Sequence, residues 1–174
     1  MVAKLTSRQS EEYVETRAPV LVLGVGNILL SDEGVGVRVV EALQRMKLPD
    51  GVEVLDGGTA SMALLDSLSN RETVIVVDAV NGKHDPGTIY RFTNGDISVQ
   101  KKVVTSLHQL ELVDALTQVE FLGCSPREVV LYGIEPKDMS AGLELTAEVE
   151  AAIPRVIELV LGELKKSALP GAGA

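Results

Sequence analysis

Three side chains that can bind a metal ion follow predicted strands of this chain. Glu33 comes after the first apolar strand, Asp78 ends the third, and His108 opens the helix after the fourth. Parallel strands end at the same edge of a sheet, so these side chains share one crevice if the first and third strands are neighbours. Two carboxylates and one imidazole could hold Ni²⁺ or Zn²⁺ and leave a coordination position open.

Each of these residues also has an ordinary structural interpretation. Asp78 could cap the loop that follows its strand, and His108 could cap the helix that it opens. Asp32 and Glu33 could both complement the dipole at the start of the helix after the first strand. Either Ser31 or Asp32 is sufficient as a cap, which leaves Glu33 as the acid available for chemistry.

The glycine turn after the first strand partly matches a dinucleotide-binding fingerprint. Gly24 and Gly26 have the required spacing, but Leu29 stands where a third glycine belongs. Asp56, at the end of the next strand, could bind a ribose hydroxyl. A pyrophosphate needs the bare amides and positive dipole of a helix start, whereas two acids place negative charge there. A nucleotide-binding α/β module is thus an alternative that the local charge opposes.

The elements that position these residues alternate along the chain. Apolar runs predict strands at 19–24, 52–56, 72–78, 87–92 and 128–134. Apolar residues at helical spacing predict helices at 32–46, 60–68, from 108 onward and at 146–164. This order predicts an α/β fold, a three-layer α/β/α sandwich whose sheet is mostly parallel, with 87–92 as an antiparallel edge strand. Pro154 predicts a kink or a later start in the last helix.

Composition limits the class of protein. The chain has 174 residues, enough for one domain with its own core, and a net charge of −9, which argues against nucleic acid and anionic membrane as partners. No apolar run reaches the ~18 residues that a membrane helix requires. The single cysteine, Cys124, cannot form an internal disulfide and fits a reducing compartment. We expect a cytoplasmic monomer with a mobile tail at 1–18, one α/β domain at 19–166 and a frayed tail at 167–174.

Four separated motifs of this chain occur together, in this order, in one protein family. They are Gly24-x-Gly26-Asn27-x-Leu29-x-x-Asp32-Glu33-Gly34-x-Gly36, Asp56-Gly57-Gly58-Thr59, Asp78-Ala79 and His108-Gln109-Leu110. With these motifs the chain closely resembles the nickel-iron hydrogenase maturation endopeptidases, from residue 20 to about residue 164. One departure is Ser61, where close relatives often have Gly, and it affects a backbone-permissive position rather than a ligand.

The resemblance implies an endopeptidase that removes a C-terminal extension from a hydrogenase large-subunit precursor after nickel insertion. It implies that Glu33, Asp78 and His108 recognise the nickel and take part in catalysis. The nickel would be supplied by the substrate, with Zn or Cd able to substitute for it. The stretch Asp56-Gly57-Gly58-Thr59 would lie beside the cleft and help select the substrate. The expected partner is the nickel-loaded precursor.

Peptide hydrolysis at such a site needs an activated water and stabilisation of the developing oxyanion. The substrate's nickel could polarise the scissile carbonyl or lower the pKa of water, and Asp78 or Glu33 could accept the proton. The chain has no Gly-x-Ser-x-Gly elbow, no His-Glu-x-x-His helix and only two histidines, which disfavours a serine protease or a resident-zinc protease. A nickel chaperone without hydrolytic activity would use the same ligands and is the second alternative.

Overall fold

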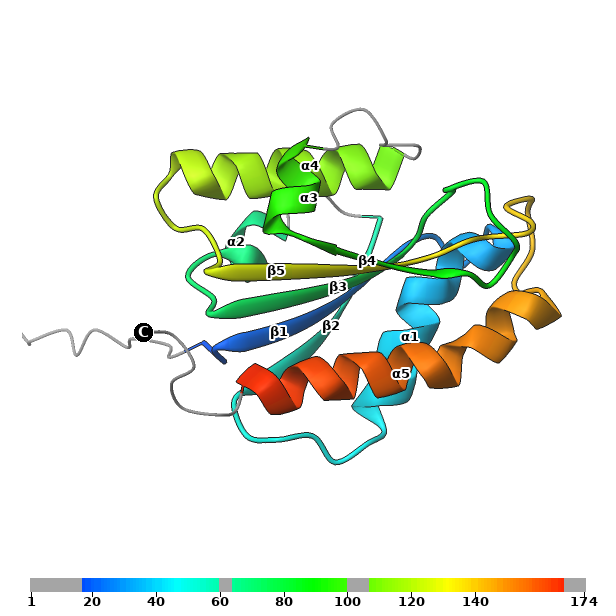
Figure 1. Cartoon of the computed structure of the whole chain (residues 1–174), viewed down its shortest axis with the longest axis horizontal. Coiled ribbons are helices and arrows are strands. Elements are labelled where there is room, and N and C mark those ends of the chain that lie inside the picture. Colours follow the sequence, from blue (N-terminus) through cyan, green and yellow to red (C-terminus); the bar gives the residue numbers. More distant parts are fainter. Residues whose placement is uncertain (1–16, 60–63, 100–106, 168–174) are drawn as a thin grey trace, which may run out of the picture.

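The computed structural model describes residues 17–59, 64–99 and 107–167, and of 97–99 and 107–111 it describes only the backbone (Figure 1). Its strands are β1 (Val20–Val25), β2 (Val52–Gly58), β3 (Thr73–Ala79), β4 (Ile89–Thr93) and β5 (Glu128–Ile134). Its helices are η1 (Ser31–Gly34), α1 (Val35–Gln44), α2 (Leu64–Leu68), α3 (Asn94–Val99), α4 (Leu107–Phe121) and α5 (Ala147–Ser167). None of the described helices is both long and apolar enough to cross a membrane.

One sheet forms the middle layer of the fold. Its strand order is β2-β1-β3-β5-β4, and only the pair β4 and β5 is antiparallel. The predicted antiparallel edge strand is therefore confirmed, and β1 and β3 are neighbours, as the metal-site hypothesis requires. Every residue of β3 is buried, which fits its five consecutive β-branched residues, Thr73 to Val77.

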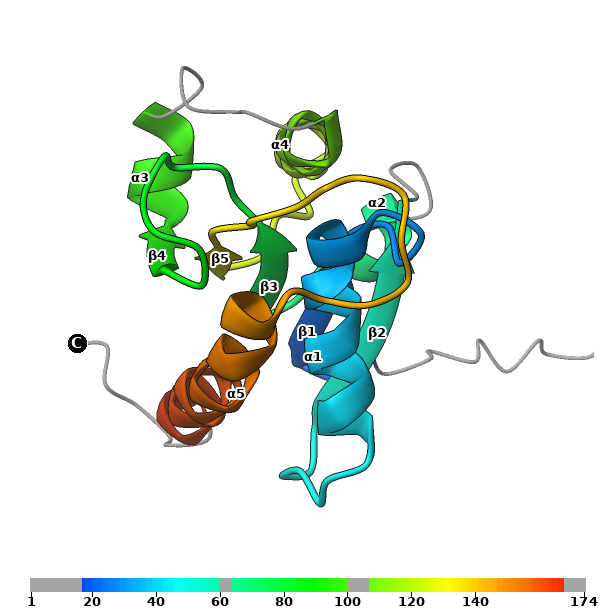
Figure 2. The same ribbon diagram turned by 90° about the vertical axis from the view of Figure 1, so that its right-hand side faces the viewer.

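Helices cover both faces of the sheet (Figure 2). Helices α1 and α5 pack on one face through an apolar cluster rich in valine, which includes Val35, Val39 and Val156. Helices α2 and α4 pack on the other face through a second cluster, which includes Leu68 and Val119. Two separate clusters, one on each side of the sheet, confirm the three-layer α/β/α architecture.

Two glycines bring the segment that carries Glu33 close to the sheet. A Cβ on Gly36 would lie 2.2 Å from the carbonyl oxygen of Val77 and 2.3 Å from that of Val25, so α1 can sit this close only without a side chain there. Gly26 has a φ of +139°, and a Cβ on it would lie 1.9 Å from the carbonyl oxygen of Glu33. The glycine spacing of the first motif therefore serves close packing of η1 and α1 against β1 and β3.

The observed elements differ from the predicted ones mainly at three places. The helix predicted at 32–46 begins as the 3-10 turn η1 and becomes α-helical at Val35. Helix α3 lies between the strand predicted at 87–92 and the next predicted helix, where the sequence predicts no element. Asp96 stabilises it by accepting hydrogen bonds from the backbone and hydroxyl of Thr93. Helix α5 runs unbroken through Pro154, so the later start is wrong; this proline is exposed, and water can satisfy the carbonyl that it leaves unbonded.

Other boundaries differ by a few residues, as helix and strand ends commonly do. Residues 60–63, at the start of the helix predicted for 60–68, lie outside the described residues, and α2 covers the rest of that prediction. The predicted tails at 1–18 and 167–174 also fall almost entirely outside the described residues, so their mobility stays a prediction.

Candidate active site

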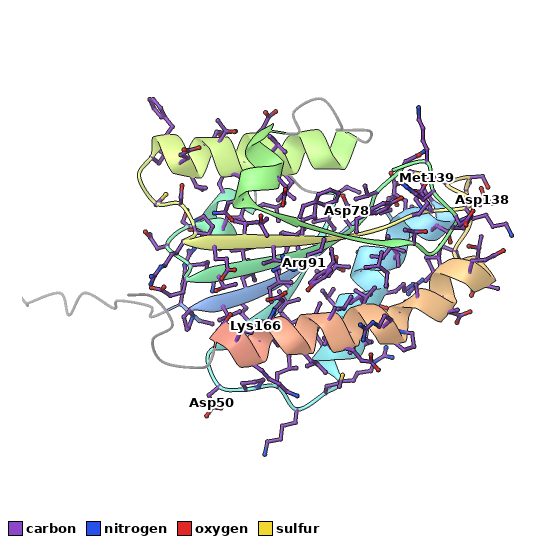
Figure 3. All side chains as sticks on the ribbon, viewed as in Figure 1. Asp50, Asp78, Arg91, Asp138, Met139 and Lys166 are labelled. Atoms are coloured by element: carbon purple, nitrogen blue, oxygen red, sulfur yellow. The ribbon has the colours of Figure 1, made fainter. Side chains whose placement is uncertain are left out.

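Asp78 is a buried carboxylate at the carboxyl end of β3 (Figure 3). Its Oδ1 accepts a hydrogen bond from the backbone N–H of Ala79 at 2.8 Å. Its Oδ2 is also buried and has no hydrogen-bond partner among the described residues. Local capping therefore occupies one oxygen of this carboxyl and leaves the other available for a ligand.

The environment of Asp78 favours its protonated form. Burial raises its pKa from 3.8 to about 8, the hydrogen bond from Ala79 lowers it in part, and the charge of Glu33 raises it further. Without a cation nearby, the Asp78 carboxyl thus retains a proton at neutral pH. A divalent cation beside it would favour the charged form, because opposite charge stabilises a carboxylate in a buried place.

Glu33 is the second buried acid at this edge. It lies in η1, which packs against β3, and its charge helps to raise the pKa of Asp78. Its backbone N–H donates to the carbonyl of Leu30 at 3.0 Å, which fixes the 3-10 turn. The structure therefore brings together two of the three predicted ligands, from segments that are 45 positions apart.

Asp32, next to Glu33 in sequence, has a structural task instead. Its buried carboxylate accepts four hydrogen bonds of 2.7–2.9 Å from the loop between β5 and α5: from the backbone N–H groups of Lys137, Asp138 and Thr146 and from the hydroxyl of Thr146. The Ser31 hydroxyl donates to Ser140 in the same loop. The interpretation of these two residues as helix caps is therefore wrong, because both bind a distant loop.

The third predicted ligand, His108, is described only in part. Its backbone lies in the first turn of α4, as predicted, but its side chain is outside the described residues. Within that described set, no group of three or more His, Cys, Asp or Glu side chains could hold a metal ion. The ligand role of His108 therefore stays a prediction.

The segment Asp56-Gly57-Gly58-Thr59 lies at the same edge of the sheet, at the end of β2 and beside β1. Asp56 is exposed, and its Oδ1 accepts a hydrogen bond from the backbone N–H of Gly58 at 2.8 Å. The carbonyl of Gly58 in turn accepts from Gly26 at 3.0 Å. These contacts fix the segment next to the turn that leads to Glu33, and its part in selecting a substrate stays a prediction.

The nucleotide-binding alternative loses support from the same region. Helix α1 begins at Val35, which is fully buried, and η1 with its two acids precedes it. A phosphate would need exposed backbone amides at this helix start and positive potential around them. The glycines that suggested a fingerprint instead allow close packing, as described above.

Glu135 is a buried acid at this edge that the sequence patterns do not single out. It accepts hydrogen bonds from the backbone of Gly82 at 2.7 Å and of Lys83 at 3.2 Å, and from the hydroxyl of Tyr90. Burial and this contact with Glu135 raise the pKa of Tyr90 to about 12. Glu135 therefore fixes the loop after Asp78. Its signal in the sequence is weak, because it is only an acid that directly follows a predicted strand.

Comparison with known proteins shows the family. Residues 37–163 match the family model of the hydrogenase maturation proteases. The chain is 46% identical over 150 residues to the hydrogenase 2 maturation protease of Escherichia coli (strain K12), covering 85% of this chain and 92% of that protein. It is 34% identical over 156 residues to a putative hydrogenase maturation protease of Methanocaldococcus jannaschii, covering 84% and 97%.

Solved structures agree with these relatives. The hydrogenase maturating endopeptidase HybD from E. coli has a TM-score of 0.81 and 45% identity, covering 86% of this chain and 93% of that one. The hydrogenase maturation protease HybD from Thermococcus kodakarensis has a TM-score of 0.70 and 28% identity, covering 86% and 99%. Sequence and fold together thus show that this chain belongs to the hydrogenase maturation protease family.

Proposed function

We propose that this protein removes a C-terminal extension from the precursor of a hydrogenase large subunit after nickel has been inserted. The observation that carries the proposal is the pair of buried acids Glu33 and Asp78 at the carboxyl edge of the sheet, with Asp78 Oδ2 unbonded within the described part of the chain. The relatives of this chain are maturation proteases that act for hydrogenases, which supports the same role here.

The donors at this edge fit a divalent cation that arrives with the substrate. Burial of a carboxylate without a compensating partner is costly, so a cation beside Asp78 relieves an unfavourable arrangement. In the proposal, Glu33 and Asp78 contribute oxygen donors and His108 contributes a nitrogen donor, a set that suits Ni²⁺. Few protein ligands leave coordination positions for groups of the precursor.

The same groups can support hydrolysis of the peptide bond. Nickel held at the edge of the sheet would polarise the scissile carbonyl or lower the pKa of the attacking water. One carboxylate of the pair Glu33 and Asp78 would accept the proton of that water and pass it to the leaving amine. Nickel beside Asp78 would favour the charged form of this carboxyl, which is the form that can accept a proton.

Intact-mass measurement of the precursor tests the proposal. The protein is incubated with nickel-loaded and with nickel-free large-subunit precursor. We expect the mass of the loaded precursor to fall by that of its extension, and the mass of the nickel-free precursor to stay unchanged. Unchanged precursor that has lost its nickel to this protein would instead identify a nickel chaperone, and cleavage of both forms would contradict recognition of nickel.

The purified protein should bind added Ni²⁺, Zn²⁺ or Cd²⁺ reversibly. Because the metal must displace the proton of Asp78, whose pKa is raised to about 8, affinity should fall by up to about tenfold for each pH unit below 8. Titration calorimetry at pH 6, 7 and 8 measures this, with Asp78→Asn as the control that removes the contribution of Asp78 to the pH dependence. A stoichiometric zinc that survives chelator treatment would point to a resident-metal protease.

Cys124→Ala should keep full processing activity. Cys124 precedes β5 at the amino edge of the sheet, opposite Asp78, where it packs against an apolar cluster and its Sγ lies 3.4 Å from Ser69 Oγ. It is a small, half-buried packing residue rather than a nucleophile. We expect a cleavage rate within about twofold of wild type and a loss of about 1 kcal/mol or less in unfolding free energy. A well-folded Cys124→Ala protein that cannot cleave would contradict the metal-centred mechanism.

A further inference from the structure

Four exposed aliphatic side chains lie at the carboxyl edge of the sheet, and we call them the edge surface. Ile28 and Leu29, in the turn after β1, are 39% and 60% exposed. Met139 and Leu143, in the loop between β5 and α5, are 38% and 60% exposed. Figure 3 shows Met139 at the same end of the sheet as Asp78. Exposed apolar side chains that gather from two separate loops mark contact sites on proteins.

Backbone hydrogen bonds join the two loops of the edge surface. Leu30 and Gly142 form a parallel bridge, in which Gly142 donates to Leu29 at 3.0 Å and Ser31 donates to Gly142 at 2.9 Å. In the register of this parallel bridge, Leu29 lies opposite Ala141 and Leu143 lies opposite Ser31, so the two leucines flank the same bridge. The carboxylate of Asp32 holds the rest of the loop, including the backbone of Asp138 next to Met139. The edge surface is therefore presented by a fixed backbone.

This surface borders the acid pair. The turn that carries Ile28 and Leu29 runs directly into η1, where Leu30 accepts the backbone hydrogen bond of Glu33. An extended peptide advances about 3.3 Å per residue. Precursor side chains within a few residues of a scissile bond held at Asp78 can therefore reach the edge surface. More distant parts of the precursor do not have to contact it.

The charges around the edge surface select against an acidic partner. Asp56, Asp138 and Glu144 are exposed at this end of the molecule, and the whole chain carries a net charge of −9. Two cations near the edge surface are paired: Lys137 with Glu148 at 2.5 Å, and Arg38 with Glu41 at 3.2 Å. The edge surface is thus apolar with an acidic rim.

We propose that the edge surface binds an apolar segment of the hydrogenase precursor, free of acidic residues, that lies within a few positions of the scissile bond. This inference rests on the proposed function and adds what the site selects in its substrate. A few apolar anchors commonly carry most of the affinity of a protein contact, and Leu29 and Leu143 are the most exposed candidates here.

The double variant Leu29→Ser with Leu143→Ser tests this surface. The matched control is Phe121→Ser with Leu122→Ser, which removes two side chains that are 91% and 68% exposed, at the end of α4 near the opposite edge. We expect the Kd for nickel-loaded precursor and the KM of cleavage to rise roughly tenfold or more in the edge variant. Its kcat, its Ni²⁺ affinity and its melting temperature should stay near wild type, and the control should change none of these values.

Three results would overturn the inference: an unchanged Kd, an equal rise in the control variant, or loss of a dimer in sedimentation experiments, which would identify a second copy of this chain as the occupant. Replacing apolar precursor residues near the mapped bond with Asp should weaken binding to wild type more than binding to the edge variant. If wild type binds the loaded precursor without cutting it, the proposed function fails and the binding comparison still decides on the surface.

Discussion

Asp78→Asn should abolish processing of nickel-loaded precursor and at the same time make the protein more stable at neutral pH. Asn keeps the size of the side chain but cannot supply a carboxylate to the metal or accept the proton of water. We expect the cleavage rate to fall roughly a thousandfold or more, as losses at cooperating catalytic groups do. Single-turnover cleavage followed by intact mass measures this, with Cys124→Ala as an active control.

The gain in stability follows from the raised pKa of Asp78. Between the unfolded value near 3.8 and the folded value of about 8, the folded protein holds a proton that the unfolded chain has released. Stability therefore falls as pH rises through this window, by up to about 1.4 kcal/mol per unit. Asp78→Asn removes this loss, so its advantage should vanish below pH 4 and reach a few kcal/mol near pH 8. Urea unfolding at both ends of the window checks this, and a variant less stable at pH 8 would contradict it.

Glu33→Gln and His108→Ala should also fold and fail to process the loaded precursor. Because the three groups are proposed to act on one nickel ion, the double variant Glu33→Gln with His108→Ala should be no worse than either single variant. Cleavage by His108→Ala at a rate near that of wild type would exclude the three-ligand site and leave His108 as a helix-entry residue.

Asp32→Ala should be the most destabilising single change at this edge, although Asp32 takes no part in the proposed chemistry. It removes a buried carboxylate that accepts four hydrogen bonds, three of them from backbone N–H groups. Those donors would lose their acceptor, so we expect a loss of about 3–5 kcal/mol in unfolding free energy. Such a loss is a large part of the roughly 5–15 kcal/mol that stabilises a domain.

Chemical denaturation compares Asp32→Ala with Glu144→Ala, which removes an exposed acid from the same loop. The control should change stability by no more than about 0.5 kcal/mol. Partial release of the loop should also weaken precursor binding, because that loop carries Met139 and Leu143. An Asp32→Ala protein with wild-type stability would show that the carboxylate does not hold the loop.

The three layers of this fold could be predicted from the sequence because the strands consist mainly of apolar residues. The buried runs before Gly24 and Asp78 and the run that ends at Ile134 contain little besides Val, Leu and Ile, and only buried strands fit them. Helix α3 is different: Asn94, Gly95 and Asp96 are typical turn residues, and only the contact of Asp96 with Thr93 shows that a short helix follows.

The candidate site could be predicted from the sequence only in part. Asp32 and Glu33 are adjacent acids that the sequence alone does not distinguish. The structural role of Asp32 comes from its hydrogen bonds to a loop 105–114 positions away. Likewise, only one carboxylate oxygen of Asp78 accepts a hydrogen bond from the described residues, and this difference depends on burial among strands that meet only in the folded sheet. Local patterns identify residue types, whereas such roles follow from long-range contacts.

Nickel K-edge absorption spectroscopy of the loaded precursor, frozen immediately after mixing with the protein, tests the central claim most directly, namely that this protein recognises nickel through Asp78. With wild type, we expect the nickel spectrum to change as an oxygen ligand is added. With Asp78→Asn at equal occupancy of the complex, the change should be smaller by one oxygen ligand, because only Glu33 and His108 can still bind the nickel. The same number of added ligands with both proteins, or an unchanged spectrum with wild type during cleavage, would contradict recognition of nickel by this carboxylate.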